Sequence, residues 1–265
     1  MHNLEDVTRL PDDFDGQVRL FPLPELVVFP HAMQPLHIFE PRYCEMLTES
    51  LEGDRLIAMA TLTGGMPFLK GEDPPIASTI CLGKIVSHAE LEDDRHNILL
   101  VGVRRAKVVR EIDAGRPFRM AKVEVSEDVY PPAGSDGRLE LKRKLLHAFA
   151  DVIPVNKNVQ QNLHELMAGQ MGLGPITDII SYTLPFTIEQ KLNLLSESDV
   201  DSRANELLRL LGTPPIQLGD SEVEDSSGDA DGGPAFPPPF SLNKCFVKPW
   251  ILGGRENGVR HQKPE

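Results

Sequence analysis

The sequence predicts an α+β chain: a small, closed or half-closed β-barrel with one inserted helix, then a helical subdomain and a disordered acidic tail. Short apolar runs separated by tight connections fill residues 18–130, and helix-spaced apolar stripes fill residues 135–212. A stretch rich in Asp, Glu, Gly, Ser and Pro follows. We therefore expect a flexible N-terminus at 1–17, a barrel at 18–130, helices at 135–212, and a mostly disordered tail at 213–265.

The strand signals lie in the first zone. Leu56–Leu62 and Ile80–Val86 are short apolar runs, and Met120–Val125 alternates with period two. His96–Glu111 predicts one long strand or two short ones, and Gly102 inside it indicates a bulge or a bend. Several short strands with tight connections are typical of a small barrel.

Helix signals occur once inside this zone and repeatedly after it. Pro41 stands in the first turn of the inserted helix, where proline is tolerated, and Gly53 ends it. Residues Thr187–Gln190 form a capping box. The later apolar stripes run through Leu141–Ile153, Val159–Met171, Ile176–Leu184, Leu192–Leu195 and Val200–Leu211. Such narrow stripes require the helices to pack on one another or on the barrel.

The tail differs in composition from the rest of the chain. Asp220–Gly233 carries six acidic residues and no basic one, a composition that buries too little apolar surface to fold. Large apolar side chains return in Phe236–Leu252. That segment is a candidate docking motif, either for the domain itself or for another protein.

Charge and cysteine content restrict the class of protein. The net charge of -13 disfavours binding to nucleic acid and to anionic membranes. No apolar run approaches the roughly 20 residues of a membrane span, and the acidic N-terminus lacks the apolar core of a signal peptide. Cys44, Cys81 and Cys245 are far apart and form neither a disulfide framework nor a zinc motif. We expect a cytoplasmic protein with reduced thiols.

The most unusual segment runs from Phe21 to Tyr43. Pro22, Pro24, Pro30 and Pro35 interrupt it, and each removes a backbone donor and favours extended backbone before it. Leu26–Phe29 and Leu36–Phe39 are expected to supply buried apolar side chains to irregular edge strands.

This segment resembles the signature of the Lon protease N-terminal domain family: Phe-Pro-Leu, an apolar stretch ending in Phe-Pro, then Pro-Leu-His-Ile-Phe-Glu-Pro-Arg-Tyr. His31 stands where the family often has Gly. A second similar stretch, Asp178–Leu208, matches the family's helical half, so the resemblance covers roughly residues 18 to 212.

The resemblance implies a PUA-like barrel followed by helices, in a stand-alone substrate-binding domain. It implies recognition of unfolded or tagged polypeptides, or of a protease or chaperone partner, without catalytic residues. The motif residues are expected to be mainly structural and to form a candidate binding surface; they are Phe29, Pro30, Pro35, His37, Phe39, Glu40, Pro41, Arg42 and Tyr43.

The sequence carries no recognisable catalytic motif. No Walker A sequence occurs, because Gly83-Lys84 is followed by Ile85 and lacks the upstream Gly. We expect no Ser–Lys peptidase domain, because low-complexity sequence stands where the resemblance would place the domains that follow. We expect no enzyme activity, no cofactor and no metal site. The alternative is a small-ligand sensor or an enzyme that uses a pocket between barrel and helices.

Several polar clusters favour structural roles over chemistry. His31 and His37 are expected to pack in apolar surroundings or to form hydrogen bonds with the backbone. The polar residues of His88–His96 are expected to form a solvated turn rather than a cation site. Arg42 is expected to form an ion pair or to cap backbone carbonyls, and Tyr43 is expected to pack on the barrel. The basic residues of Arg104–Arg110 are expected to form a solvated strand face. Met33, Met46, Met59 and Met66 are interpreted mostly as core residues, with an adaptable hydrophobic groove as the alternative.

Overall fold

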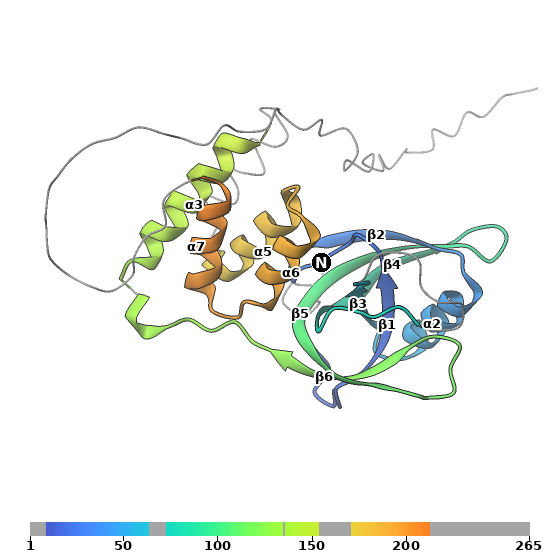
Figure 1. Cartoon of the computed structure of the whole chain (residues 1–265). Coiled ribbons are helices and arrows are strands. Elements are labelled where there is room, and N and C mark those ends of the chain that lie inside the picture. Colours follow the sequence, from blue (N-terminus) through green and yellow to red (C-terminus); the bar gives the residue numbers. More distant parts are fainter. Residues whose placement is uncertain (1–8, 64–72, 135, 154–170, 213–265) are drawn as a thin grey trace, which may run out of the picture. The chain divides into compact units, whose positions relative to one another are not determined.

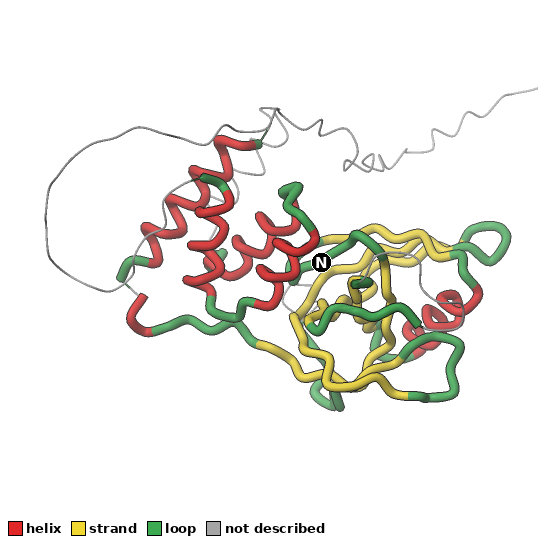
Figure 2. Tube along the Cα trace, viewed as in Figure 1, coloured by secondary structure: helices red, strands yellow, loops and turns green. Residues whose placement is uncertain are grey.

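The computed structural model describes residues 9–63, 73–134, 136–153 and 171–212, all within one compact unit, Met1–Asp220. It is an α+β structure in which strands precede helices (Figures 1 and 2). The strands are β1 (Gln17–Leu23), β2 (Met33–Ile38), β3 (Leu56–Thr61), β4 (Thr79–Glu90), β5 (His96–Ile112) and β6 (Met120–Ser126). The helices are α2 (Pro41–Glu52), the 3-10 turn η1 (Pro132–Gly134), α3 (Arg138–Val152), α5 (Leu173–Thr183), α6 (Ile188–Ser196) and α7 (Val200–Leu210).

The six strands form one curled sheet in the order β2-β5-β4-β3-β1-β6. β5 also pairs with β6, so five strands form a hydrogen-bonded circuit; β2 stands outside it and, among the described residues, pairs only with β5. β1 and β3 are parallel, and the other pairs are antiparallel. The arrangement departs from a regular barrel. The predicted α+β class is confirmed, but the predicted barrel is not a regular one. β2 is an edge strand as expected, but β1 is not, because it pairs with both β3 and β6.

Local sequence explains where the elements begin and end. α2 starts at Pro41 and is followed by Gly53, as predicted. β5 is one long strand of 17 residues that bends enough to pair with β2, β4 and β6. The capping box at Thr187 is present: its side chain accepts from the Gln190 amide, and the Gln190 side chain accepts from the Thr187 amide.

A bulge lies beside Gly102, as predicted, and the glycine has a second role. The register shift places one additional residue, Val103, beside Gly102, so the bulge is adjacent to the glycine. A Cβ on Gly102 would lie 2.0 Å from the Phe29 carbonyl oxygen. The His31 amide donates to Gly102 O at 2.8 Å, and the Gly102 amide donates to Ala32 O at 2.8 Å. Gly102 is therefore required because the turn before β2 lies directly against β5.

The same turn connects the sheet to the helices. Val27, Phe29 and Ala32 are buried in one apolar cluster with residues of α3, α5, α6 and α7. A second cluster packs α2 against the sheet through Met46 and Leu47. His31 adopts a φ of 63°, a left-handed conformation that glycine adopts without strain. The Phe29–Ala32 turn thus fixes the helices on the sheet.

Two expectations lie outside the described residues. The apolar stripe at Val159–Met171 falls there except for its last residue, Met171, which is exposed. The tail from residue 213 onward, including Phe236–Leu252, also falls there. Within the described ranges, every helix is too short or too polar to cross a membrane.

Candidate functional site

Four charged side chains, three of them buried and Asp128 partly buried, join the sheet to the helices. Arg105 of β5 is 3% exposed, and it donates to Asp128, which follows β6, and to Asp178 of α5. Arg203 of α7 is fully buried and donates to both carboxylate oxygens of Asp128 at 2.9 and 3.0 Å. Two arginines and two aspartates thus balance in charge across four segments of the chain.

Additional hydrogen bonds fix the two guanidinium groups. Arg105 donates to the Leu195 carbonyl of α6, while Arg203 donates to Thr177 Oγ1 at 2.8 Å and to the Glu197 carbonyl at 2.6 Å. A Cβ on Gly174 would lie 2.2 Å from Asp128 Oδ2, so the start of α5 can approach this cluster only with glycine there. The cluster therefore determines how α5, α6 and α7 sit on β5.

Asp178 is the least satisfied member of the cluster. Its Oδ2 is buried without a hydrogen-bond partner among the described residues. Burial raises the pKa of Asp178 from its ordinary value of 3.8 to about 6, although Arg105 and Arg203 act in the opposite direction. The folded chain therefore holds this proton more tightly than the unfolded chain does.

A raised carboxyl pKa sets the sign of the pH dependence. Protonated Asp178 favours the folded state, so its contribution is fully present below pH 3.8 and is lost as pH rises through about 6. A shift of roughly two units corresponds to about 3 kcal/mol. We expect the free energy of unfolding of the wild-type chain to fall by about that amount relative to Asp178→Asn across this window. Urea unfolding of both proteins at several pH values measures it, and parallel pH profiles would contradict it.

A second feature is an exposed sheet face whose side chains are mostly uncharged; Lys84, which pairs with Val101 as Met33 does, lies at its end. In β2, Met33 is 53% exposed, and Pro35 and His37 point to the same side. Between β2 and β5, Pro35 pairs with Leu99 and His37 pairs with Asn97. Between β5 and β4, Leu99 pairs with Ser87 and Asn97 pairs with Ala89. Directly paired residues share a face of an antiparallel sheet. We name this surface the open face: Met33, Pro35, His37, Phe39, Ser87, Ala89, Asn97 and Leu99.

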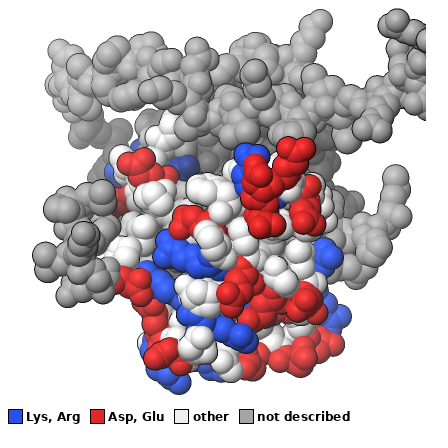
Figure 3. Space-filling view, turned by 90° about the vertical axis from the view of Figure 1, so that its right-hand side faces the viewer, with Lys and Arg blue, Asp and Glu red and all other residues white. Residues whose placement is uncertain are grey.

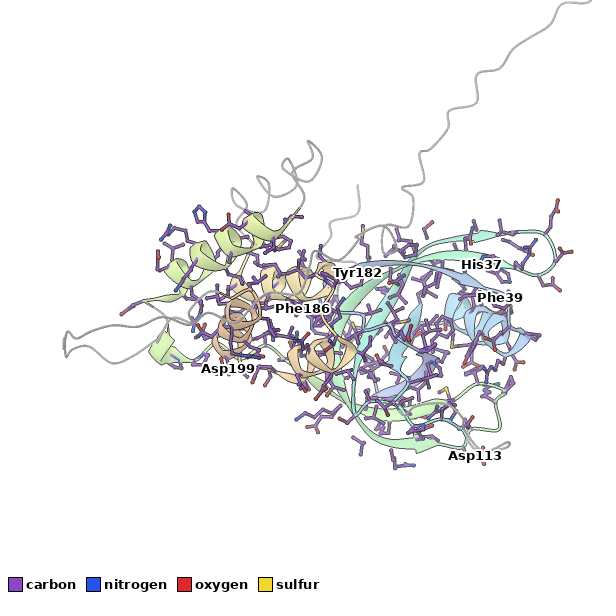
Figure 4. All side chains as sticks on the ribbon, turned by 45° about the horizontal axis from the view of Figure 1, so that its top comes forward. His37, Phe39, Asp113, Tyr182, Phe186 and Asp199 are labelled. Carbon is purple, nitrogen blue, oxygen red and sulfur yellow. The ribbon has the colours of Figure 1, made fainter. Side chains whose placement is uncertain are left out.

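Phe39 extends the open face beyond the end of β2. Its side chain is 61% exposed, which corrects the expectation that Leu36–Phe39 is buried throughout. The His37 and Phe39 rings lie 5.8 Å apart, and His37 Nδ1 lies 2.8 Å from Asn97 Oδ1. Figure 4 shows His37 and Phe39 along the outer margin of the sheet.

The helices contact side chains of the sheet on the face opposite the open face. Tyr182, near the end of α5, donates to Gln34 Oε1 at 2.7 Å, and Phe186 is half-buried against the helical cluster (Figure 4). Arg105 of β5 donates to the Leu195 carbonyl of α6. Gln34 alternates with Met33 and Pro35 along β2, and Arg105 pairs with Cys81, so neither side chain belongs to the open face.

The motif residues divide into two groups. Phe29, Pro30 and Tyr43 are buried, with Tyr43 packed on Phe21 at 4.6 Å between ring centroids. Pro35, His37 and Phe39 are exposed on the open face.

The motif's last residues act within α2. Glu40 and the exposed Pro41 begin that helix. Arg42 pairs with Glu40 at 2.9 Å and lies over the Tyr43 ring, as its favoured structural role predicts.

The structure also places the histidine, arginine and methionine groups that the sequence singled out. His88 Nε2 lies 3.1 Å from His96 Nδ1, but the described part of the chain contains no set of three or more metal-ligating side chains. Arg104–Arg110 is not a uniformly solvated face, because Arg105 is buried in the charge cluster. Of the four barrel-zone methionines, Met33 is exposed, Met46 and Met59 are buried, and Met66 lies outside the described residues.

The fold and these sites define an α+β domain in which a curled sheet carries a helical subdomain through buried charges. The family model of the ATP-dependent protease La (LON) substrate-binding domain matches residues 17–213. The chain belongs to this family, which confirms the resemblance seen in the sequence.

Individual relatives agree with this assignment. The chain is 22% identical over 225 residues to the Lon protease of Desulfosudis oleivorans, covering 83% of this chain and 27% of the relative. It is 22% identical over 198 residues to Lon protease of Escherichia coli K12, covering 74% of this chain and 24% of the relative. The chain thus spans about a quarter of the length of these proteases.

Two solved structures share the fold. The Lon N-terminal domain protein of Xanthomonas campestris matches with a TM-score of 0.51 and 21% identity, covering 75% of this chain and 99% of that chain. The N-terminal domain of the Mycobacterium avium complex Lon protease matches with a TM-score of 0.56 and 16% identity, covering 74% and 98%.

Proposed function

We propose that this domain binds unfolded or tagged polypeptide segments on the open face and has no catalytic activity of its own. The observation that carries the proposal is an exposed, partly apolar sheet face without acidic side chains in a chain of net charge -13. Exposed apolar surface bordered by polar residues marks interaction sites. The family name supports a polypeptide as the bound species.

The mode of binding follows from the edge strand. The second edge of β2 pairs with no other strand among the described residues, and an extended peptide adds to such an edge as a further strand in many complexes. Pro35 lies in the middle of β2 and has no amide hydrogen to donate. We therefore propose that side-chain contacts on the open face, rather than strand addition, hold the polypeptide.

The sensor or enzyme alternative finds less support. Among the described residues, the sheet and helices meet through buried apolar clusters and the charge cluster. The hollow that the structure shows lies instead at the tip of the β4–β5 hairpin. A binding module in the cytoplasm that serves a protease or chaperone partner, without nucleic acid or membrane, fits the acidic composition.

Loss of the exposed side chains tests the proposal. We expect the double variant Met33→Ser/Phe39→Ser to bind a permanently unfolded model protein about tenfold more weakly, because two apolar contacts are lost. Fluorescence anisotropy measures the affinity, and thermal unfolding checks that the fold is retained. Val109→Ser is the matched control, since Val109 is also 61% exposed but lies in β5 near its C-terminal end. Equal affinities of all three proteins would exclude the open face.

We also propose that Phe236–Leu252 is a docking segment for another protein. The support is compositional: apolar side chains concentrate there after a stretch with six acidic residues, Asp220–Gly233. Truncation after Gly212 is then expected to leave the Tm unchanged while abolishing capture of the partner. A large drop in Tm would contradict docking elsewhere.

A further inference from the structure

Two histidine rings meet across the β4–β5 hairpin. His88 lies near the end of β4, and His96 is the first residue of β5. Glu90 pairs directly with His96, and His88 precedes Glu90 by two residues, so the two histidines occupy diagonal positions on one face. Ala89 of the open face lies between His88 and Glu90 and points to the other side. The histidine pair is therefore separate from the open face.

The facing ring nitrogens are close enough to bind one metal ion together. His88 Nε2 lies 3.1 Å from His96 Nδ1, and the ring centroids lie 5.2 Å apart. Zinc–imidazole bonds are about 2.0–2.1 Å long, so two ligating nitrogens lie about 2.9 Å apart at a right angle and about 3.3 Å apart at the tetrahedral angle. The observed separation falls between these two values, so both rings need only turn their lone pairs toward a common point.

The tautomers of the two rings decide between a hydrogen bond and a metal ion. In an N–H···N hydrogen bond, one of the two facing nitrogens carries the hydrogen. A metal ion needs both facing lone pairs, so the ring that carries this hydrogen moves it to its other nitrogen and stays neutral. Glu90, exposed on the same face, offers a carboxylate to such an outward N–H group, an arrangement that commonly orients ligating histidines.

The ligand type selects the class of ion. Imidazole nitrogens suit Zn²⁺, Ni²⁺ and Cu²⁺, whereas Mg²⁺ and Ca²⁺ prefer oxygen ligands. Within the described ranges the site offers two nitrogen ligands and no third protein ligand in place. Water then completes the coordination shell, and we expect reversible binding rather than a permanent structural metal.

We propose that His88 and His96 bind one Zn²⁺, Ni²⁺ or Cu²⁺ ion through Nε2 and Nδ1, respectively. The ion joins the end of β4 to the start of β5 beside the hairpin turn. This site goes beyond the proposed polypeptide binding and does not depend on it, because the open face lies on the other side of the same strands. It differs from the sequence expectation of a solvated turn without a cation site.

Titration of the full chain with ZnCl₂ tests the proposal by isothermal calorimetry. Acidic side chains gather on the side of the molecule seen in Figure 3, so weak binding through carboxylates must be separated from binding through imidazole. Excess MgCl₂ makes this separation, since Mg²⁺ competes for carboxylate oxygens and not for imidazole nitrogens. We expect one Zn²⁺ site to persist in excess MgCl₂. Full competition by Mg²⁺ would overturn the proposal.

Variants assign the Zn²⁺ site to the histidine pair. His88→Gln and His96→Gln are each expected to weaken it about tenfold or more, because even the loss of an outer hydrogen bond to a ligand costs that much. His147→Gln removes an exposed histidine of α3 and should retain full affinity. Unchanged Zn²⁺ affinity in both hairpin variants would overturn the proposal.

A thiolate replacement separates metal binding from a hydrogen-bonding role. His96→Cys, kept reduced, retains a zinc ligand and should bind Zn²⁺ more tightly than His96→Gln does. Zn²⁺ should also raise the Tm of the wild type but not that of His88→Gln/His96→Gln. Equal Zn²⁺ affinities of His96→Cys and His96→Gln, with the same Tm shift in the double variant as in the wild type, would show that the pair only links the strands.

Discussion

Arg203→Met is expected to lower the free energy of unfolding by about 3–5 kcal/mol, since it removes one partner from a buried ion cluster. Methionine approximately retains the apolar volume, so cavity formation adds little. The substitution leaves Asp128 and Asp178 facing a single arginine, Arg105, and it removes the donors to Thr177 Oγ1 and the Glu197 carbonyl. Urea unfolding at neutral pH measures the loss.

Asp178→Asn should be much less costly than Arg203→Met. Burial disfavours the charged form of Asp178, and its Oδ2 lacks a hydrogen-bond partner among the described residues. Without Arg203, the pKa of Asp178 rises further, because Arg203 lowers it in the wild-type chain. The stability of Arg203→Met should therefore fall more steeply than that of the wild type as pH rises above 4. Arg209→Met removes an exposed pair with Glu206 and serves as the control. A loss in Arg203→Met no larger than in that control would show that the cluster does not hold the helices.

The sequence predicted where the helices and strands lie better than it predicted which side chains are buried. Period-two alternation and apolar runs located β3, β4, β5 and β6, and glycine and proline located both ends of α2. These signals depend only on residues close together in the chain, so they can be recognised without the structure. The closure of β5 onto β6 and the exclusion of β2 from that circuit depend on how one long strand bends, which no local pattern specifies.

The buried charges were not predicted, because Arg105 was judged by residue type and Asp178 and Arg203 were not considered as core residues. Arg105 was assigned to a solvated face with its basic neighbours, although it stands two positions after Val103, whose side chain is buried. Arg203 lies three residues after Val200 and four before Leu207, within the apolar stripe of α7. A charged residue at a core position of a periodic pattern needs a buried partner. That reasoning would have identified Arg203 in the sequence, but not its partner Asp128, which lies in a loop.

The motif illustrates a different limit. Its apolar residues were all expected to be buried, yet Phe39 is 61% exposed because β2 ends at Ile38 and α2 begins at Pro41. Sequence identifies the conspicuous segment but does not separate its scaffold residues from its surface residues. The separation appears only when the pairing of β2 with β5 is known.

Gly102→Ala is expected to destabilise the fold by about 2–4 kcal/mol, because overpacking here acts on backbone rather than on a flexible side chain. The new Cβ would lie 2.0 Å from Phe29 O, so the turn must move away from β5. That movement breaks the two backbone hydrogen bonds between Gly102 and the turn and displaces Phe29, which is fully buried against the helices. Urea unfolding measures the loss, and amide hydrogen exchange at His31 reports whether the turn is the part that opens.

Gly172→Ala separates this effect from glycine replacement in general. Gly172 precedes α5, and the nearest atom to its added Cβ would lie at 3.7 Å, so its replacement should cost less than about 1 kcal/mol. Because the displaced turn leads directly into β2, Gly102→Ala should also weaken binding at the open face, though it contacts no ligand. Full polypeptide affinity in a destabilised Gly102→Ala protein would show that β2 keeps its place without the turn. The buried Phe29 and Pro30 would then serve stability alone, and recognition would depend only on the exposed half of the motif.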